Sequence, residues 1–118
     1  MSDLTRTDVI KLIAIATRPL NLSGVNLNKI DLSRLDLTGA NLTNADLGSA
    51  SLVGANLTRA NLFEAFLNKA NLTGANLTIA NLEGAYLFGA DLTGACLTDV
   101  NLKGATLKGA IGVKGYKQ

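Results

Sequence analysis

The pattern of the chain is set out by residues 40–62, which read ANLTNADLGSASLVGANLTRANL. A leucine stands at every fifth position here, and this spacing holds without exception for eighteen leucines, from Leu22 to Leu107. The residue two before each leucine is small or aliphatic, most often Ala, and the residue just before it is usually Asn or Asp. The whole chain is organised around this five-residue unit.

The period of five excludes both regular secondary structures for the repeated region. A step of five residues advances about 140° around an α-helix, so the leucines would not form a stripe. In a continuous strand an odd period places successive leucines on opposite faces. We therefore expect short extended pieces separated by turns, with each leucine and its alanine partner pointing into a common interior. All eighteen leucines are predicted to be buried in a stack of coils.

Units such as Ala40-Asn41-Leu42 and Ala75-Asn76-Leu77 resemble the A-[DN]-L-x-x motif of the pentapeptide-repeat family, in particular its single-domain cyanobacterial members. The resemblance implies an all-β solenoid: a right-handed quadrilateral (four-sided) β-helix, here of about four and a half coils. The period alone does not fix the number of sides. On this basis we expect an N-terminal capping helix within residues 1–19, the β-helix over 20–110 and a C-terminal tail over 111–118.

Composition and charge narrow the class of protein. The chain has 118 residues, one cysteine, no histidine and a formal net charge of +2. One domain is expected, and a single cysteine cannot form an internal disulfide, which fits a reducing cytoplasm. Four lysines and no acidic residue follow residue 100: Lys103, Lys108, Lys114 and Lys117. Four lysines alone are a weak signal for a nucleic-acid site and favour a solvated edge, so we expect no nucleic-acid partner.

The first segment lacks the repeat and predicts a helix from about Thr7 to Thr17. Thr5 with Asp8 resembles a capping box, Thr7 is a competing N-cap, and apolar residues follow at helical spacing. The β-branched residues in this segment leave a strand as the alternative. Its short apolar stretch favours neither a signal peptide nor a membrane span. The helix is expected to cover the open end of the first coil, where bulkier residues replace Ala: Leu20, Val25, Ile30 and Leu35.

The turns follow from the last residue of each unit. Nine units end in Gly, which suits the positive φ of a type II turn, and nine end in other residues, for which we expect negative φ. The Asn or Asp before each leucine is expected to bond nearby backbone groups in these turns. After Leu107 the repeat lapses, since Gly112 stands where the next leucine is due. Ile111, Val113 and Tyr116 are expected either to fold over the last coil or to leave it open to a second copy.

Residues twenty apart should stack on successive coils, and this arrangement gathers four aromatic residues on the second face. Phe66 and Tyr86 occupy the same outward position on adjacent coils, Phe88 lies on the same face, and Phe63 lies across the corner. Stacked rings of this kind can simply stabilise neighbouring coils. Clustered exposed aromatic residues are also common anchors of protein interfaces. We take Phe63, Phe66, Tyr86 and Phe88 as the candidate partner-binding patch.

The sequence predicts no catalytic, cofactor-binding or metal-binding residues. Without histidine, and with Cys96 alone at a position usually held by Asn or Asp, no nucleophile lies beside a base. Asp31 and Asp91 share a column but are three coils apart, so a metal site is not expected. The glycines lie at corners and match neither a phosphate loop nor a dinucleotide motif. The protein is not expected to be an enzyme.

Two classes of function remain. The first is a cytoplasmic protein-interaction scaffold with an unidentified protein partner and no membrane association, either a monomer or a weak dimer through the C-terminal end. The alternative follows from the family resemblance, because some pentapeptide-repeat proteins imitate duplex DNA and bind DNA gyrase or another type II topoisomerase. This sequence departs from that pattern in its positive net charge, its short repeat and the absence of an interrupting loop.

Overall fold

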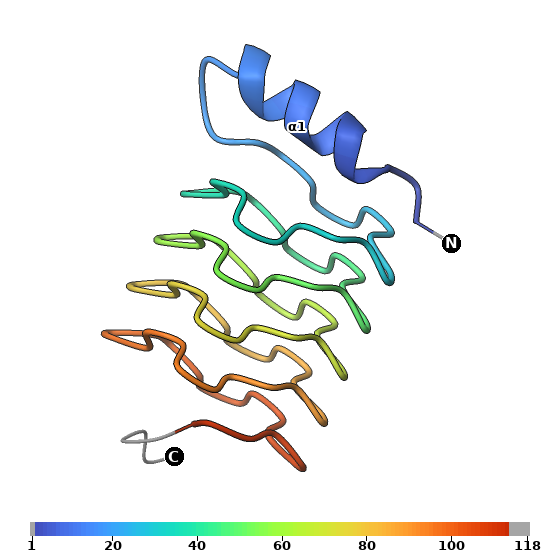
Figure 1. Ribbon diagram of the computed structural model, residues 1–118. Coiled ribbons are helices and arrows are strands. Elements are labelled where there is room, and N and C mark those ends of the chain that lie inside the picture. Colours follow the sequence, from blue (N-terminus) through green and yellow to red (C-terminus); the bar gives the residue numbers. More distant parts are fainter. Residues whose placement is uncertain (1, 114–118) are drawn as a thin grey trace.

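The computed structural model describes residues 2–113, and the helix in this range is α1, Arg6–Ile15 (Figure 1). Thr5 is its N-cap: the Thr5 hydroxyl accepts from Asp8 N at 3.1 Å, and Thr5 N donates to Asp8 Oδ2 at 2.9 Å. The predicted helix and capping box are confirmed, with the helix starting at Arg6 and ending at Ile15. It ends there because Ala16 is already extended, with ψ of 131°.

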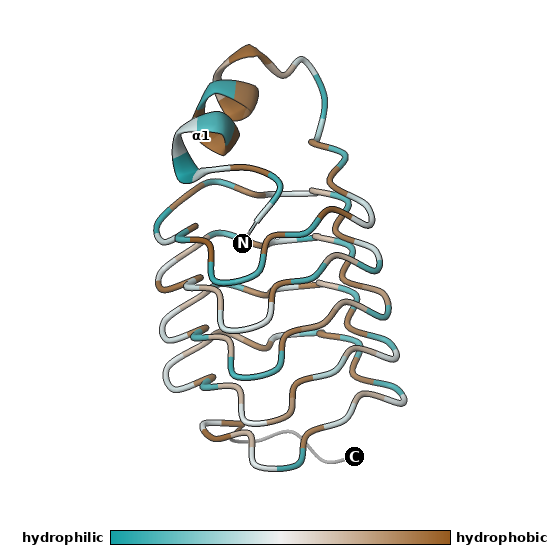
Figure 2. Cartoon of the chain, turned by 90° about the vertical axis from the view of Figure 1, so that its right-hand side faces the viewer, coloured by the Kyte–Doolittle hydropathy of each residue, from teal (hydrophilic) through white to brown (hydrophobic). Residues whose placement is uncertain are grey.

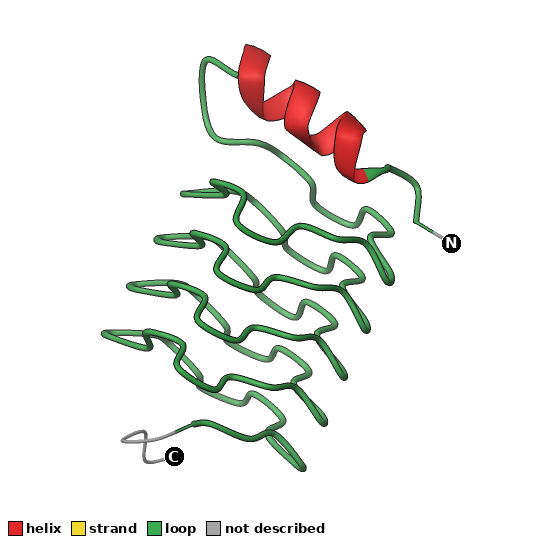
Figure 3. Ribbon diagram, viewed as in Figure 1, coloured by secondary structure: helices red, strands yellow, loops and turns green. Residues whose placement is uncertain are grey.

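The repeated region is a stack of coils with α1 at its N-terminal end (Figure 1). Isolated parallel bridges join residues twenty positions apart, as in Asn41 with Asn61 and Asn61 with Asn81. Between bridges the chain turns, so the coils are drawn as loops in Figure 3. Because a turn closes every fifth residue, each coil has four faces, which we number from the N-terminus: face 1 begins with residues 20–24, face 2 with 25–29, face 3 with 30–34 and face 4 with 35–39.

The interior is filled by the leucine row and the preceding alanines, as the period predicts. Leu42, Leu62 and Leu82, on successive coils, are 0–1% exposed. Figure 2 shows hydrophobic and hydrophilic segments alternating along the coils. The prediction that all eighteen leucines are buried is wrong for Leu97 and Leu107, which are only partly buried. Both lie in the last coil, where no further leucine layer covers them.

The eighteen corners share one geometry, which corrects the prediction that half of them have negative φ. At every corner the N–H after the turn donates to the leucine C=O three residues earlier, as Ala80 N does to Leu77 O at 2.9 Å. The third residue of each of these turns has positive φ whether or not it is glycine. The non-glycine residues have φ between 53° and 64°: Lys29, Arg34, Asn44, Ser49, Arg59, Glu64, Lys69, Ile79 and Asp99. The stacked coils impose the turn on residues that do not favour it.

Helix α1 supplies hydrogen-bond donors to the first coil on face 3. Within the stack, Leu32 N donates to Ser51 O of the next coil at 2.8 Å, and this bond recurs from coil to coil. The carbonyl groups of Asp31 and Ser33 have no preceding coil to donate to them. Arg6 Nη1 takes that place, at 3.2 Å from Asp31 O and 2.9 Å from Ser33 O. The Arg6 guanidinium also forms an ion pair with the Asp31 carboxylate at 3.4 Å.

Asp3 makes the corresponding contact on face 2. Asp3 N donates to Asn26 O at 2.6 Å, and Asn26 N donates to Asp3 Oδ2 at 3.0 Å. Val9 of α1 is fully buried in the core cluster of the coils. The N-terminal segment thus pairs with the first coil by both backbone and side-chain groups, as expected for a segment that covers an open sheet edge.

The coil pattern continues past the last repeat leucine. Ile111 pairs with Asp91, and Leu92 N donates to Ile111 O at 2.8 Å. Ile111 therefore does not fold over the last layer; its side chain is 57% exposed. Val113 is partly buried against the core, and Lys114, Tyr116 and Lys117 lie outside the described residues.

Candidate functional site

The outward position before each leucine normally has a structural task. Every Asn or Asp at this position accepts, at Oδ1, the backbone N–H two residues on, as Asn41 does from Thr43 N at 3.1 Å and Asp91 from Thr93 N at 3.0 Å. The predicted turn role of these residues is confirmed. Phe66 and Tyr86 occupy the same position on face 2. Phenylalanine has no side-chain acceptor, and the tyrosine hydroxyl lies at the far end of the ring, too far to accept this N–H. These two units therefore lack the bond from side chain to backbone N–H that Asn and Asp make at the same position in other units.

Phe66 and Tyr86 form a stacked pair on the surface. Their ring centroids are 4.9 Å apart and their planes differ by 5°. The rings are 42% and 43% exposed, and Phe88, two residues after Tyr86, is 46% exposed. Phe63 is partly buried at the end of face 1. Among the described residues, the structure brings Phe66 and Tyr86 into ring contact and places Phe88 on the same face.

A hollow of about 280 Å³ lies beside this pair and is lined by Asn28, Asp46, Phe66 and Asn68. Asp46 Oδ1 accepts from Gly48 N at 2.9 Å and from Asn28 Nδ2 at 3.2 Å. The order of bridges, Asp46 with Phe66 and Phe66 with Tyr86, places Asp46 on the side of Phe66 that Tyr86 does not cover. The hollow thus combines a carboxylate, two carboxamides and one ring.

Gly48 makes room for this hollow. It is the one glycine that directly follows a repeat leucine, and its φ is not positive, so the backbone does not require glycine there. A Cβ at Gly48 would lie 2.7 Å from Asn28 Nδ2, 3.1 Å from Asp46 Oδ1 and 3.3 Å from Asn68 Nδ2. The missing side chain therefore lets Asn28 reach Asp46 and leaves the space open.

Other carboxylates on the outer surface are engaged by their own turns. The Thr38 hydroxyl donates to Asp36 Oδ1 at 2.6 Å and, with Thr38 N, holds the pKa of Asp36 below its usual value. The hydroxyl and N–H of the following Ser or Thr lower the pKa of Asp31 and of Asp91 in the same way. These groups stay ionised near neutral pH and have no base or nucleophile beside them, so they do not form a catalytic pair.

Cys96 is exposed on face 4 and lies between two hydroxyls. Its Sγ is 3.3 Å from Thr78 Oγ1 and 3.3 Å from Thr98 Oγ1. These contacts, led by the one with Thr78, lower the pKa of the Cys96 thiol to about 7. A thiolate is thus accessible near neutral pH, but no proton-accepting side chain accompanies it.

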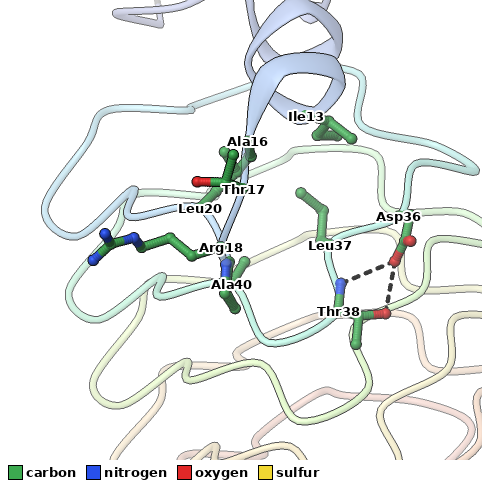
Figure 4. A pocket seen from close by; sticks show the side chains of 10 residues that line it. Ile13, Ala16, Thr17, Arg18, Leu20, Asp36, Leu37, Thr38 and Ala40 are labelled. Carbon is green, nitrogen blue, oxygen red and sulfur yellow. Dashed lines mark hydrogen bonds between the residues drawn. The ribbon is translucent and has the colours of Figure 1, made fainter.

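A second hollow, of about 290 Å³, lies where the chain passes from α1 to the first coil (Figure 4). Ile13 and Leu37 line it, and the Asp36 carboxylate at its edge is bonded to Thr38. The Arg18 guanidinium points away from Asp36 (Figure 4). Because Asp36 is bonded to Thr38 and Arg18 points away from it, the two charged residues that line this hollow do not act together.

Two other kinds of site are absent from residues 2–113. No three Cys, Asp or Glu side chains lie close enough together to hold a metal ion. No helix in this range has the length and apolar character needed to cross a membrane.

The sequence patch of four aromatic residues omitted the polar part of the hollow. Asp46 looked like an ordinary turn residue, and Asn28 and Asn68 are each separated from it by about one coil of the chain. One signal was present in the sequence: Gly48 breaks a position that elsewhere always carries a side chain. The effect of glycine at this position depends on which side chains lie above and below Gly48 on the neighbouring coils.

Comparisons with known proteins agree with this architecture. The family model described as "Pentapeptide repeats" matches in 8 copies, over residues 21–52, 40–78 and 67–104. A pentapeptide repeat protein (Rfr23) from the cyanobacterium Cyanothece 51142 is 41% identical, with a TM-score of 0.78 over 82% of this chain and 67% of that one. One from the Arabidopsis thaliana thylakoid lumen is 32% identical, also with a TM-score of 0.78, over 86% and 71%.

A third solved structure, a pentapeptide repeat protein from Nostoc PCC 7120, is 34% identical with a TM-score of 0.56, over 86% of this chain and 74% of that one. A comparison with curated proteins gave no match. The family model covers most of the chain, and the solved structures share both its unit and its stacking. The chain belongs to the pentapeptide-repeat family.

Proposed function

We propose that this protein is a non-enzymatic scaffold that binds another protein through face 2. One observation carries the proposal: Phe66 and Tyr86 form an exposed stacked pair at a position where the repeat elsewhere places a turn acceptor. The fold does not need aromatic rings there, because the same coils hold together on the other faces without them. Exposed aromatic side chains supply large, rigid contact area and are frequent anchors of interfaces.

Phe88 and Phe63 extend the same docking surface. Phe88 continues the exposed aromatic area along face 2, and Phe63 adds a partly buried ring at the corner between faces 1 and 2. The other exposed large hydrophobic side chains of the described residues lie on α1, at one corner and at the end of the stack: Ile10, Ile15, Ile79 and Ile111. A partner that buries the aromatic residues would gain more from face 2 than from any of the other faces.

Topoisomerase binding, the alternative that the family resemblance leaves open, has no specific observation in its favour. A mimic of duplex DNA needs a strongly negative surface to replace the phosphates. This chain has a formal net charge of +2. We therefore retain the scaffold as the proposed function.

The proposal includes a finer description of the architecture and setting. We take the stack to be a right-handed, four-sided β-helix of about four and a half coils, located in the cytoplasm. Handedness follows from the family resemblance, and the compartment from the single cysteine. One similar structure comes from a thylakoid lumen. An experimental structure and cell fractionation check these two points.

The test is affinity capture with a matched control. Immobilised wild-type protein is compared with the double variant Phe66→Asn, Tyr86→Asn, which restores the usual residue of the repeat and should fold normally. The control is Asn56→Ser with Asn76→Ser on the opposite face 4. Ser51 on face 3 shows that the repeat accepts serine at this position. Quantitative mass spectrometry then measures the proteins retained from a lysate of the native organism.

We expect at least one protein to be retained by the wild type and by the face 4 control and lost from the aromatic variant. Circular dichroism and thermal melting verify that all three proteins are folded. Identical sets of retained proteins for the wild type and the aromatic variant would refute a docking role for face 2.

A further inference from the structure

We propose that the hollow beside Phe66 binds the guanidinium group of an arginine side chain, and that the protein partner presents this arginine to face 2. The inference rests on the proposed function and assigns a chemistry to its docking surface. The inference depends on Asp46, Gly48 and Phe66, and the side chains of Asn28 and Asn68 lie at the sides of the hollow.

The charge of the hollow indicates a cation. Asp46 is the one charged residue that lines it. The donors to Asp46 Oδ1, Gly48 N and Asn28 Nδ2, are both neutral. Within the described residues the ion pair is that of Arg6 with Asp31, so the Asp46 carboxylate has no cationic partner, and its Oδ2 is not engaged. A carboxylate on a partly buried surface attracts a positively charged group and disfavours an anion.

The shape of the hollow selects a flat cation. The Phe66 ring has Tyr86 on one side, parallel within 5°, and its other side faces the coil of Asp46. A guanidinium can lie against that ring face while its N–H groups reach the carboxylate. An ammonium is a compact point charge and cannot stack in this way. Arginine therefore uses both the ring and the carboxylate, whereas lysine uses mainly the charge.

The two carboxamides border the hollow with their Nδ2 groups, and one of them donates to Asp46. Asn28 donates its Nδ2 to Asp46, which leaves its Oδ1 as an acceptor. The side chain of Asn68 makes no hydrogen bond to the described residues, and its Nδ2 lies 3.3 Å from the space that a Gly48 Cβ would fill. The N–H groups of a guanidinium are therefore expected to reach Asp46 Oδ2, the carboxylate oxygen to which neither Gly48 N nor Asn28 Nδ2 donates.

The inference is tested by NMR titration of the full ¹⁵N-labelled chain with three blocked tripeptides, acetyl-Gly-X-Gly-amide, in which X is arginine, lysine or citrulline. Citrulline keeps the planar shape of arginine but has no charge. We expect the arginine peptide to shift the Gly48 backbone amide and the Asn28 and Asn68 side-chain amides in a saturable way. The lysine and citrulline peptides should bind at least about threefold more weakly, because each lacks one of the two interactions. Equal binding of either peptide would overturn the assignment.

Two variants test whether the arginine peptide binds in the hollow. Asp46→Asn keeps the acceptor for Gly48 N, as Asn does at this position in other units, but removes the charge and should weaken binding about tenfold or more. Gly48→Ala fills the space and should abolish binding, while the fold tolerates a side chain after each other repeat leucine. The matched control is Asp91→Asn on face 3, which removes the same charge from a column without a ring. Equal weakening by Asp91→Asn would overturn the proposal.

The two proposals can fail separately. If lysate capture depends on Phe66 and Tyr86 but the arginine peptide does not bind, face 2 is a docking surface and the arginine assignment is wrong. If the peptide binds in the hollow but no captured protein depends on the aromatic pair, the hollow binds arginine and the scaffold proposal is wrong.

Discussion

Faces 1 and 2 have the same backbone and the same interior but different outer surfaces. On face 1, asparagine occupies the position before the leucine in every coil: Asn21, Asn41, Asn61, Asn81 and Asn101. On face 2 the same position carries Asn26, Asp46, Phe66, Tyr86 and Thr106. The bond between coils is unchanged, since Leu62 N to Asn81 O and Leu67 N to Tyr86 O are both 2.7 Å.

The side chains of face 1 bond to one another as well as to their turns. Asn101 Nδ2 donates to Asn81 Oδ1 at 3.2 Å, and Asn81 Nδ2 lies 3.4 Å from Asn61 Oδ1. Face 2 replaces this polar ladder with a ring stack and a hollow. The fold therefore determines which residues fill the interior and the turns, but it accepts many residue types at the outer position before the leucine. A face that lacks the polar ladder is thus a candidate for a binding surface.

The largest effect is expected inside the stack, where the two faces should not differ. Leu62 and Leu67 are both 0% exposed, one beneath each face. Leu62→Ala and Leu67→Ala should each lower the free energy of unfolding by about 2–5 kcal/mol, because each leaves a cavity in a closely packed column. Chemical denaturation followed by circular dichroism measures both. Leu97→Ala in the last coil, where the leucine is only partly buried, is the control and should be milder.

A large difference in the free energy of unfolding between Leu62→Ala and Leu67→Ala would contradict the expectation that the two faces share one interior. It would mean that the interior also differs beneath the two faces, and that the aromatic residues belong to a local rearrangement of the core. The m-value should be checked in each variant, because a stack of repeats can lose cooperativity when one coil is weakened.

A smaller effect is expected at the outer position, where the faces should differ. Asn61→Ala removes the acceptor for Phe63 N, at 3.0 Å, and for the side chain of Asn81. It should lower the free energy of unfolding by about 1–2 kcal/mol. Phe66→Asn loses a ring pair of about 0.5–1.5 kcal/mol but gains a turn acceptor of similar value, so its net effect should be near zero.

Thermal melting of these two variants compares the roles of the faces, with Asn61→Asp, which keeps the acceptor, as the control. If Phe66→Asn destabilised the protein more than Asn61→Ala, the ring stack would serve stability. The main argument for face 2 as a docking surface would then be lost.

The sequence predicts the interior well because one physical requirement repeats there. A leucine at every fifth residue excludes a helix and a continuous strand, so the chain must turn to give the leucines a common interior. The spacing of Thr5 and Asp8 indicates the capping box of α1, although it leaves Thr7 as a competing N-cap. The contact of Arg6 with Asp31 and Ser33 could not be predicted in this way. It joins residues 25 and 27 positions apart across a region without the repeat, and no pattern in the sequence links them.

The hollow on face 2 could not be predicted from the sequence for a related reason. Gly48 is conspicuous as the only glycine after a repeat leucine, but its effect comes from Asn28 and Asn68 on the neighbouring coils. The register that brings them together follows from the twenty-residue period. The direction in which Asn28 turns, toward Asp46 Oδ1, does not. Periodicity therefore predicts which residues are neighbours and leaves open which of them bond.

Effects of at most about 1 kcal/mol are expected at the corners that join the faces, where the sequence-based prediction of negative φ was wrong. Ile79, at the corner that leads into face 1, has φ of 60°, which costs a β-branched residue about 1–2 kcal/mol. Ile79→Gly relieves this strain but increases the entropy of the unfolded chain by about 0.4–1 kcal/mol, so a net stabilisation of about 0.5 kcal/mol is expected.

Gly74→Ala is the reverse test: its φ is +68°, no atom lies within 4 Å of an added Cβ, and a loss of about 1 kcal/mol would come from the backbone alone. If both variants melted at the wild-type temperature, these corners would not be strained. Opposite shifts would show that the stacked coils hold every corner in one conformation and that face 1 and face 2 differ only in the side chains they present.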